Sequence, residues 1–167
     1  PRFTGDRDEL PPQQLAQNVT YRGGFALYGH DIVGATGSLA ELTIRYPNSS
    51  ETAIRVLSEN FLIDQPEKVS AADARVAIYI DGDSITHPSV QAEYQLQAKT
   101  IKILKGEGAL AKTKFSSTYH EMDFQADVLL WDITQPEIEI AAISQSGARG
   151  AVFESQAVYT PRVTAQL

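Results

Sequence analysis

The sequence predicts an all-β fold, and two observations carry that prediction. Apolar and polar residues alternate along many short segments, which is the pattern of strands that bury one face. Turn-forming residues separate these segments at intervals of roughly ten residues, and no comparable stretch combines helical spacing of apolar residues with capping residues. We therefore expect an antiparallel sandwich or jelly roll, or a solenoid-like β-meander, of about nine to twelve strands.

Strands are expected where the alternation is strict. Residues 90–97 carry Val90, Ala92, Tyr94 and Leu96 on one face and polar side chains on the other, so a strand should begin at Val90. Residues 122–130 alternate in the same way and predict one strand. The apolar sets of the other expected strands are Leu42, Ile44 and Tyr46; Val76, Ile78 and Ile80; Ile101 and Ile103; Ile138 and Ile140; and Phe153, Ala157 and Tyr159.

Turns and possible helices complete the expected organisation. Residues 8–17 and 69–75 are short exceptions to the absence of helical spacing, and we expect a helical turn or two in each. The chain is accordingly divided into an N-terminal extension with a short helix, residues 1–18, and a single β domain, residues 19–167. Because the chain begins with Pro1, we expect it to be a fragment of a larger protein. The turn signals are Gly23-Gly24, residues 34–37, Pro47-Asn48, Asp81-Gly82, residues 106–108, Gln135-Pro136 and residues 147–150.

Composition narrows the function classes. A chain of 167 residues is long enough to bury one sizeable core, and the absence of cysteine excludes disulfides, thiolate metal sites and a cysteine nucleophile. The net charge is -7, and the lysines and arginines are scattered along the sequence. We therefore expect neither a nucleic-acid partner nor an anionic membrane surface, since both require a basic patch. No apolar run has the length of a transmembrane segment.

Three phrases of the sequence carry a resemblance: YRGGFALYGHDIVG, AIYIDGDSITHPSVQAEYQ and STYHEMDFQADVLLWDI. They resemble very large, poorly characterised envelope proteins of Gram-negative bacteria that are built from long β-rich arrays. Those proteins are similar in character to the β-jelly-roll modules of lipopolysaccharide transport. The resemblance implies a structural module located outside the cytoplasm, in the periplasm or associated with the outer membrane. Its implied partners are neighbouring β modules of the parent protein, with a lipid-like chain or a glycan as further candidates; it implies no active-site residues.

The stretch DGDSITH has two interpretations. Asp81 and Asp83 are the oxygen ligands that a divalent ion such as calcium could use, although calcium prefers six to eight oxygens. The alternative, which we favour, is a tight hairpin between Ile80 and Ser84. In that hairpin Asp81-Gly82 would form a type I′ turn and Asp83 would bond to its own backbone.

Other candidate sites carry weaker signals. His30, His87 and His120 come from three separate loops and could converge on zinc, but their spacing matches no common zinc motif. The expected reading of His87 is structural, because Pro88 favours an extended residue before it and can open a strand. Neither a GxSxG elbow nor a GxGxxG phosphate loop occurs, and most carboxylates alternate onto wet faces. We expect no catalysis and no cofactor.

Two aromatic residues are candidates for ligand binding. Tyr79 and Trp131 are phased opposite to the main apolar set of their strands, so we expect both to face outward, where a ring could stack on a sugar or contact a neighbouring module. The sequence therefore predicts a non-catalytic structural or scaffolding β module of an envelope protein that contacts lipid-like chains. The alternative is a carbohydrate-binding jelly-roll module, assisted by calcium, that uses Tyr79 or Trp131 together with Asp81 and Asp83.

Overall fold

The computed structural model describes residues 12–28, 31–34, 38–118, 121–144 and 152–159, and it confirms the all-β prediction. Within these described residues, nine strands have five or more residues, six have three or four, and the one helix is a short 3₁₀ turn. The elements are β1 (Gln13–Ala16), β2 (Val19–Arg22), β3 (Phe25–Tyr28), β4 (Asp31–Gly34), β5 (Ala40–Arg45), β6 (Thr52–Ser58), β7 (Asn60–Asp64), β8 (Lys68–Ile80), β9 (Asp83–Gln95), β10 (Thr100–Lys105), η1 (Ala109–Lys112), β11 (Phe115–Ser117), β12 (Met122–Phe124), β13 (Val128–Asp132), β14 (Ile138–Ser144) and β15 (Val152–Tyr159).

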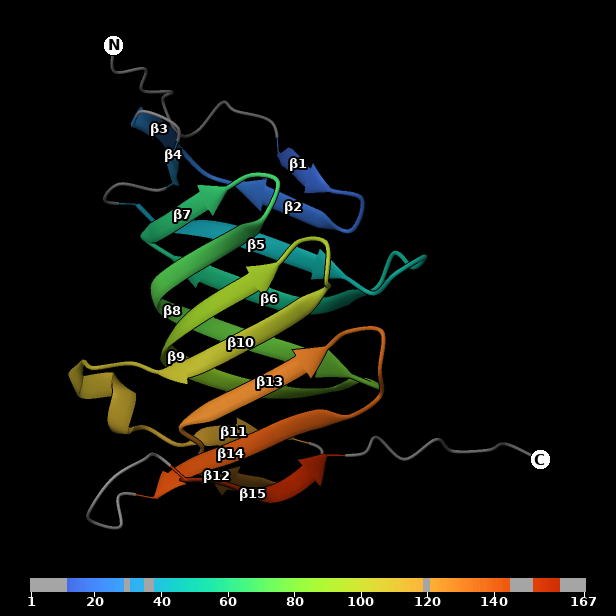
Figure 1. The fold of residues 1–167 in the computed structure, drawn as a ribbon, viewed down its shortest axis with the longest axis vertical. Helices are drawn as coiled ribbons and strands as arrows, with labels where there is room; N and C mark the ends of the chain where they lie inside the picture. The colour runs from blue at the N-terminus through green and yellow to red at the C-terminus, as the bar shows by residue number, and fades with distance from the viewer. Residues whose placement is uncertain (1–11, 29–30, 35–37, 119–120, 145–151, 160–167) are drawn as a thin grey trace.

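All of the strands belong to one antiparallel sheet that is folded back on itself. The first half of β8 pairs with β7 and its second half with β6, while the first half of β9 pairs with β11 and its second half with β10. The two long strands β8 and β9 pair with each other along both halves, so they run through both layers of the molecule (Figure 1). The first layer contains β1, β2, β5, β6, residues 75–80, residues 83–87, β11 and β12. The second layer contains β3, β4, β7, residues 68–72, residues 90–95, β10, β13, β14 and β15.

Paired bulges mark the place where β8 and β9 change layer. From Ala71 to Ala74 the strand β8 advances three residues while β9 advances two, and just beyond this point β9 carries the extra residue instead. Asp73 adopts a positive φ of 48° in the first bulge, and Pro88, which lacks an N–H, lies in the second. Bulges bend strands and increase their twist, so two bulges on adjacent strands turn the sheet at one line.

On either side of the long strands, the chain crosses the same line as two shorter consecutive strands, one in each layer, with a break between them. The strands β6 and β7 both pair with one edge of β8 and are separated by a single residue, Glu59. The strands β10 and β11 follow the same scheme, as do β12 and β13, with longer segments between them; in each case one strand lies in each layer. The bends follow the left side of Figure 1 and the hairpin turns of both layers follow the right side. The fold is therefore a meander in connectivity and a sandwich in cross-section.

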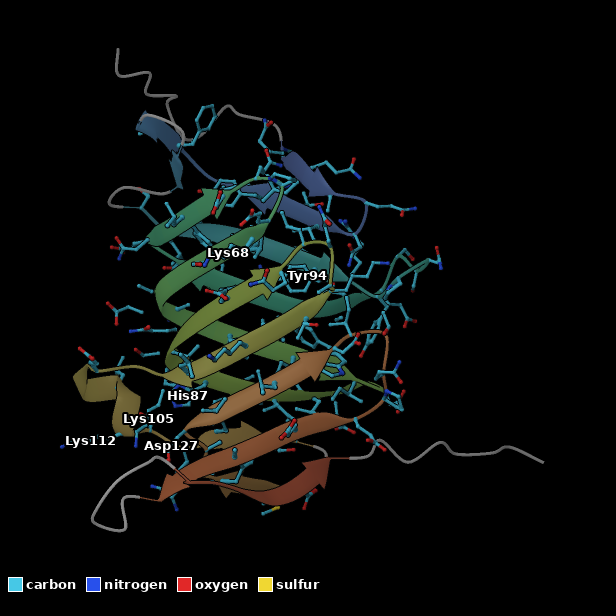
Figure 2. The ribbon with its side chains drawn as sticks, in the orientation of Figure 1. Lys68, His87, Tyr94, Lys105, Lys112 and Asp127 are labelled. Atoms are coloured by element: carbon cyan, nitrogen blue, oxygen red, sulfur yellow. The ribbon has the colours of Figure 1, made fainter. Side chains whose placement is uncertain are left out.

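The two layers enclose one apolar core. Contacts between them include the rings of Tyr21 and Phe61, whose centroids lie 5.4 Å apart. Asn18 Nδ2 donates a hydrogen bond to the buried hydroxyl of Tyr94 at 3.3 Å and another to the carbonyl of Arg45 at 3.0 Å. Figure 2 shows Tyr94 on the side of the hairpin turns and His87 on the side of the bends. Burial of alternating residues from both layers is the main force that holds the sheet in its folded form.

Two helical expectations are wrong. Residues 13–16 form β1, which pairs with β2, so this part of the expected extension belongs to the sheet. Residues 69–75 lie inside β8, where the bulge separates the buried residues Ala71 and Ala74 by three positions. A bulge thus imitated the three-residue spacing of a helix.

Two expected strands have different limits. Residues 122–130 are not one strand, because the chain is interrupted at residues 125–127 between β12 and β13. The interruption coincides with the bend, and it reverses which residues face the core: Leu129 is fully buried, although the predicted alternation placed it outward. The strand expected to begin at Val90 begins at Asp83 and continues through Pro88.

Candidate functional site

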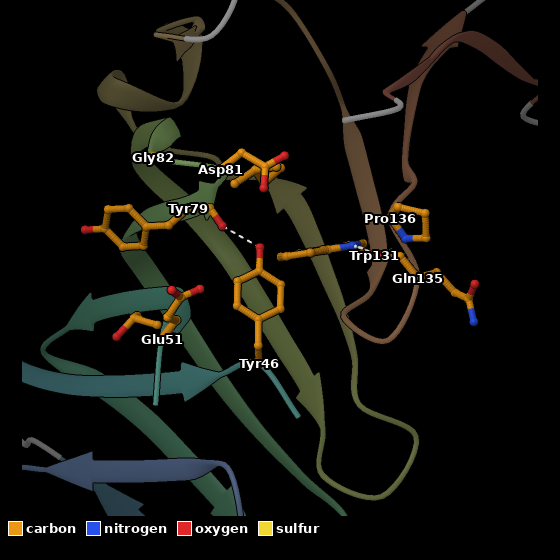
Figure 3. Close-up of a pocket in the computed structure, with 10 residues that line it drawn as sticks. Tyr46, Glu51, Tyr79, Asp81, Gly82, Trp131, Gln135 and Pro136 are labelled. Atoms are coloured by element: carbon orange, nitrogen blue, oxygen red, sulfur yellow. Dashed lines mark hydrogen bonds between the residues drawn. The ribbon is translucent and has the colours of Figure 1, made fainter. Parts of the chain in front are cut away.

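The candidate site is a cleft at the hairpin side of the molecule, between the two layers. It has a volume of about 670 Å³, and its walls include Tyr46, Asp81 and Gly82 of the first layer and Trp131 and Pro136 of the second. We call it the mouth cleft (Figure 3). At the mouth cleft the edges of the two layers lie apart, and at its inner end the rings of Tyr46 and Trp131 join the two layers.

Trp131 forms the inner wall of the mouth cleft. Its side chain is 3% exposed, so the expectation that it faces outward is wrong. The interruption before β13 changed the phase of the strand, and Leu129, Trp131 and Ile133 all face the core. The indole Nε1 donates a hydrogen bond to the carbonyl oxygen of Gln135 at 2.9 Å, which satisfies the polar atom of this buried ring.

Tyr46 joins the first layer to the second at the mouth cleft. Its ring meets that of Trp131 edge to face, with centroids 5.9 Å apart, and its hydroxyl donates a hydrogen bond of 2.6 Å to the carbonyl oxygen of Tyr79. The sequence identified Tyr46 only as an apolar strand residue. Its position directly after β5 and before Pro47-Asn48 is the signal that could have placed it at the rim.

Tyr79 and Trp131 do not share a binding surface. Tyr79 is partly exposed and alternates with the buried residues Ile78 and Ile80, so the expectation that it faces outward is confirmed. Figure 3 shows its ring pointing away from Tyr46 and Trp131, so that its backbone carbonyl faces the mouth cleft. A ligand in the cleft would contact Trp131 on one wall while the Tyr79 ring lies on the outer surface of the first layer.

Asp81 and Gly82 form the tight turn that the sequence predicted. Both have positive φ, 50° and 86°, as a type I′ turn requires. Ile80 pairs directly with Asp83, so the flanking residue on the second strand is Asp83 rather than Ser84. Asp81 lines the mouth cleft and is exposed.

Asp83 is engaged elsewhere. Its Oδ1 accepts a hydrogen bond of 3.0 Å from the hydroxyl of Thr118, and the hydroxyl oxygen of Thr118 accepts one of 2.8 Å from the backbone N–H of Ser84. The expected bond from Asp83 to its own backbone is thus replaced by a link to the turn after β11. Among the residues that the structure describes, no group of three or more acidic or histidine side chains is placed to hold a metal ion.

His87 lies at the bend, where both of its ring nitrogens form hydrogen bonds within the fold. Its side chain is 2% exposed, and its Nδ1 accepts a hydrogen bond from the N–H of Ser89 at 3.1 Å. The proton is therefore on Nε2, which donates to the carbonyl of Thr113 at 2.8 Å. The other two histidines of the zinc hypothesis, His30 and His120, lie outside the described residues.

Chemically, the mouth cleft offers aromatic and aliphatic walls with carboxylates at its rim. Glu51 and Asp81 supply the carboxylates, and Tyr46, Trp131 and Pro136 supply the apolar surface. In the part of the chain that the structure describes, no helix has the length and apolar character that a membrane crossing needs. No protein-family model, curated protein or solved structure matches the chain.

Proposed function

We propose that the protein is a non-catalytic structural module of an envelope protein outside the cytoplasm, and that it continues a β array through the open edges of its sheet. The observation that carries this proposal is the open ends of the sheet. Along the main path of described strands, β1 and β15 lie at the two ends, and each pairs with a single neighbour. An unpaired strand edge presents N–H and C=O groups that another strand can extend. In β1 the carbonyl of Leu15 already accepts a hydrogen bond of 3.2 Å from Gln65 Nε2, so the added strand would pair with the remaining groups.

The composition of β1 supports this role. The strand reads QQLA and contains no lysine or proline, the residues that commonly protect an edge against pairing. Its first two side chains are exposed and uncharged. A neighbouring module could therefore add a strand beside β1 without removing a charge from water.

The mouth cleft supports the second part of the proposal, contact with lipid-like chains. Tyr46 and Pro136 give the cleft apolar surface that is open to solvent between the two layers. An acyl chain of a lipid would bury these surfaces, which is favourable by about 25 cal/mol per Å² of apolar area. The resemblance to β modules of lipopolysaccharide transport points to the same class of ligand.

The edge proposal is tested by hydrogen exchange of β1 at increasing protein concentration. We expect exchange in residues 13–16 to slow as the concentration rises, together with a higher sedimentation coefficient. Gln14→Lys places a charge on the exposed surface of β1 and should suppress both effects. Gln17→Lys adds the same charge in the adjacent turn and serves as the matched control. Exchange that does not depend on concentration in any variant would refute edge pairing.

A carbohydrate-binding module is the second candidate function. The observation that favours it is the combination of aromatic walls and exposed carboxylates at one cleft, since sugars present both apolar C–H faces and hydroxyl donors. Titration with a panel of neutral oligosaccharides, with and without calcium, tests it. Asp81→Asn should weaken binding at the mouth cleft, and binding that Asp81→Asn leaves unchanged would count against this site.

A further inference from the structure

The four arginines that the structure describes lie on one surface. Arg22, Arg45, Arg55 and Arg75 each follow or precede buried residues on their strands, so they all point away from the core on the first layer. We define the arginine face as the outward side chains of β2, β5, β6 and residues 75–80. These four segments contain four arginines and one acidic residue, Glu41, with no lysine, so their net charge is +3. The whole chain carries a charge of -7.

The register of the sheet determines the spacing of the charges. Arg22 pairs with Glu41, Glu41 with Leu57 and Leu57 with Arg75, so Arg22 and Arg75 lie at the ends of one row. Three strand spacings of about 4.8 Å separate them, which is roughly 14 Å. Arg55 lies between them in the next row, where it is paired with Thr43. A single extended anionic chain could therefore contact several arginines at once. These arginines are scattered along the sequence, and the register of the sheet brings them to one surface.

Most of this charge lacks a carboxylate partner. Glu41 pairs with Arg55 at 2.8 Å, and this hydrogen bond lowers the pKa of Glu41 and raises the pKa of Arg55. Arg45 donates to the neutral hydroxyl of Thr20 at 3.0 Å. Within the described residues, neither Arg22 nor Arg75 forms an ion pair. Three guanidinium groups thus remain available to an external anion.

A hollow at the centre of the arginine face adds shape to the charge. It has a volume of about 320 Å³ and is lined by Glu41, Thr43, Thr52, Arg55 and Tyr79. The partly exposed ring of Tyr79 presents a flat apolar surface, and Thr52 presents a hydroxyl group, whereas the hydroxyl of Thr43 donates to Glu41 at 3.1 Å. A sugar ring can pack its C–H face on such an aromatic ring while its hydroxyls bond to threonine.

We propose that the arginine face binds an anionic polysaccharide, with carboxylate or phosphate groups held by Arg22 and Arg75 and a sugar ring packed on Tyr79. Guanidinium groups match carboxylates and phosphates in geometry, because two parallel N–H groups can bond to two oxygens. The surface suits a glycan better than a membrane: of the described exposed large apolar residues, Leu39, Leu62, Leu110 and Met122, none belongs to the arginine face. This inference is independent of the sheet edges on which the structural role depends.

Calorimetric titration of the chain with polygalacturonate, against neutral dextran of similar length, tests the proposal. We expect binding to polygalacturonate that weakens as salt is added, and none to dextran. The double variant Arg22→Gln, Arg75→Gln should weaken binding by about tenfold, because it removes two exposed charge contacts with the polyanion. Lys102→Gln, on the outer surface of the second layer, is the matched control and should bind normally. Thermal melts establish that each variant is folded.

Further measurements separate a glycan from other anions. Inorganic phosphate should compete weakly with polygalacturonate for the arginines. Tyr79→Ser should weaken binding to polygalacturonate and leave the binding of inorganic phosphate unchanged. Preferential binding to anionic phospholipid vesicles or to a DNA oligonucleotide would overturn the proposal in favour of that partner. Binding to polygalacturonate that the double arginine variant does not alter would also overturn it. A negative result in the β1 hydrogen-exchange test would not affect the outcome of this titration, so the edge proposal and the arginine-face proposal are tested independently.

Discussion

The rings of Tyr46 and Trp131 meet edge to face across the two layers, with centroids 5.9 Å apart, and they close the interior beside the mouth cleft. Trp131→Ala should lower the free energy of unfolding by about 3 kcal/mol or more, because it leaves a cavity and removes the contact between the layers. Urea denaturation measures the loss. Tyr79→Ala, which truncates a partly exposed ring on the outer surface, should cost much less. Equal losses would show that Trp131 does not join the layers.

Two buried serines should respond in opposite ways to the same substitution. The Ser58 hydroxyl donates to the carbonyl of Ala72 at 2.6 Å, and its oxygen accepts from the N–H of Asn60 at 2.9 Å, so it supports the bulge of β8. The Ser117 hydroxyl is buried without a partner among the described residues. Ser58→Ala should cost about 2 kcal/mol, and Ser117→Ala should be neutral or stabilising. Chemical denaturation of both variants decides the comparison.

Gly23 occupies a position where a side chain does not fit. A Cβ atom there would lie 2.4 Å from the Cβ of Ala40 and 2.9 Å from the hydroxyl oxygen of Tyr21. Gly23→Ala should therefore destabilise the protein by about 2 kcal/mol or more through overpacking at the bend. Gly108→Ala is the control, because its Cβ would meet nothing within 4 Å. Equal melting temperatures for the two variants would contradict the packing explanation.

Stability should fall in alkali. Burial raises the pKa of Tyr21 from 10.0 to about 12, and burial also raises the pKa of Tyr94. Both tyrosines are neutral in the folded and unfolded chains at neutral pH. Above pH 10 the unfolded chain releases these protons first, so stability decreases as the pH rises. Tyr21 alone should account for up to about 3 kcal/mol between pH 10 and 12.

Urea denaturation at a series of pH values measures this dependence. Tyr21→Phe removes the titrating hydroxyl together with its 2.8 Å hydrogen bond to the carbonyl of Gly24, so it should be less stable at neutral pH. Its stability should nevertheless decline less steeply above pH 10 than that of the unmodified chain. Parallel declines would exclude Tyr21 as the responsible group.

Asp81 and Asp83 provide the test of the metal hypothesis. Because the side chain of Asp83 is bonded to Thr118, we expect calcium and zinc to leave the melting temperature unchanged relative to EDTA. An ion present at about 100 times its dissociation constant would instead stabilise the fold by roughly 2.7 kcal/mol. A stabilisation of that size, absent from an Asp81→Asn, Asp83→Asn variant, would establish a metal site at this turn.

Part of the candidate site could be predicted from the sequence. The turn at Asp81-Gly82 and the outward ring of Tyr79 depend on residues adjacent in the chain, and both predictions are confirmed. The position of Trp131 depends on an interruption at residues 125–127, which exists because the strand crosses the bend. Gly23-Gly24 is a true signal of a break, but it marks a bend between β2 and β3 rather than a hairpin. Glycine frees the backbone for either, so its presence does not distinguish them.

The sequence by itself determined the all-β class and the tight turn at Asp81-Gly82, because alternation and turn chemistry are local properties, while it left sandwich and meander open. Only the tertiary structure decided that each long strand crosses two layers, that Trp131 faces the core and that the arginines gather on one face. Arg22 and Arg75 are neighbours through the pairings of Glu41 and Leu57, which join strands far apart in the chain. Register is a relationship between strands, so it arises only when the sheet is assembled.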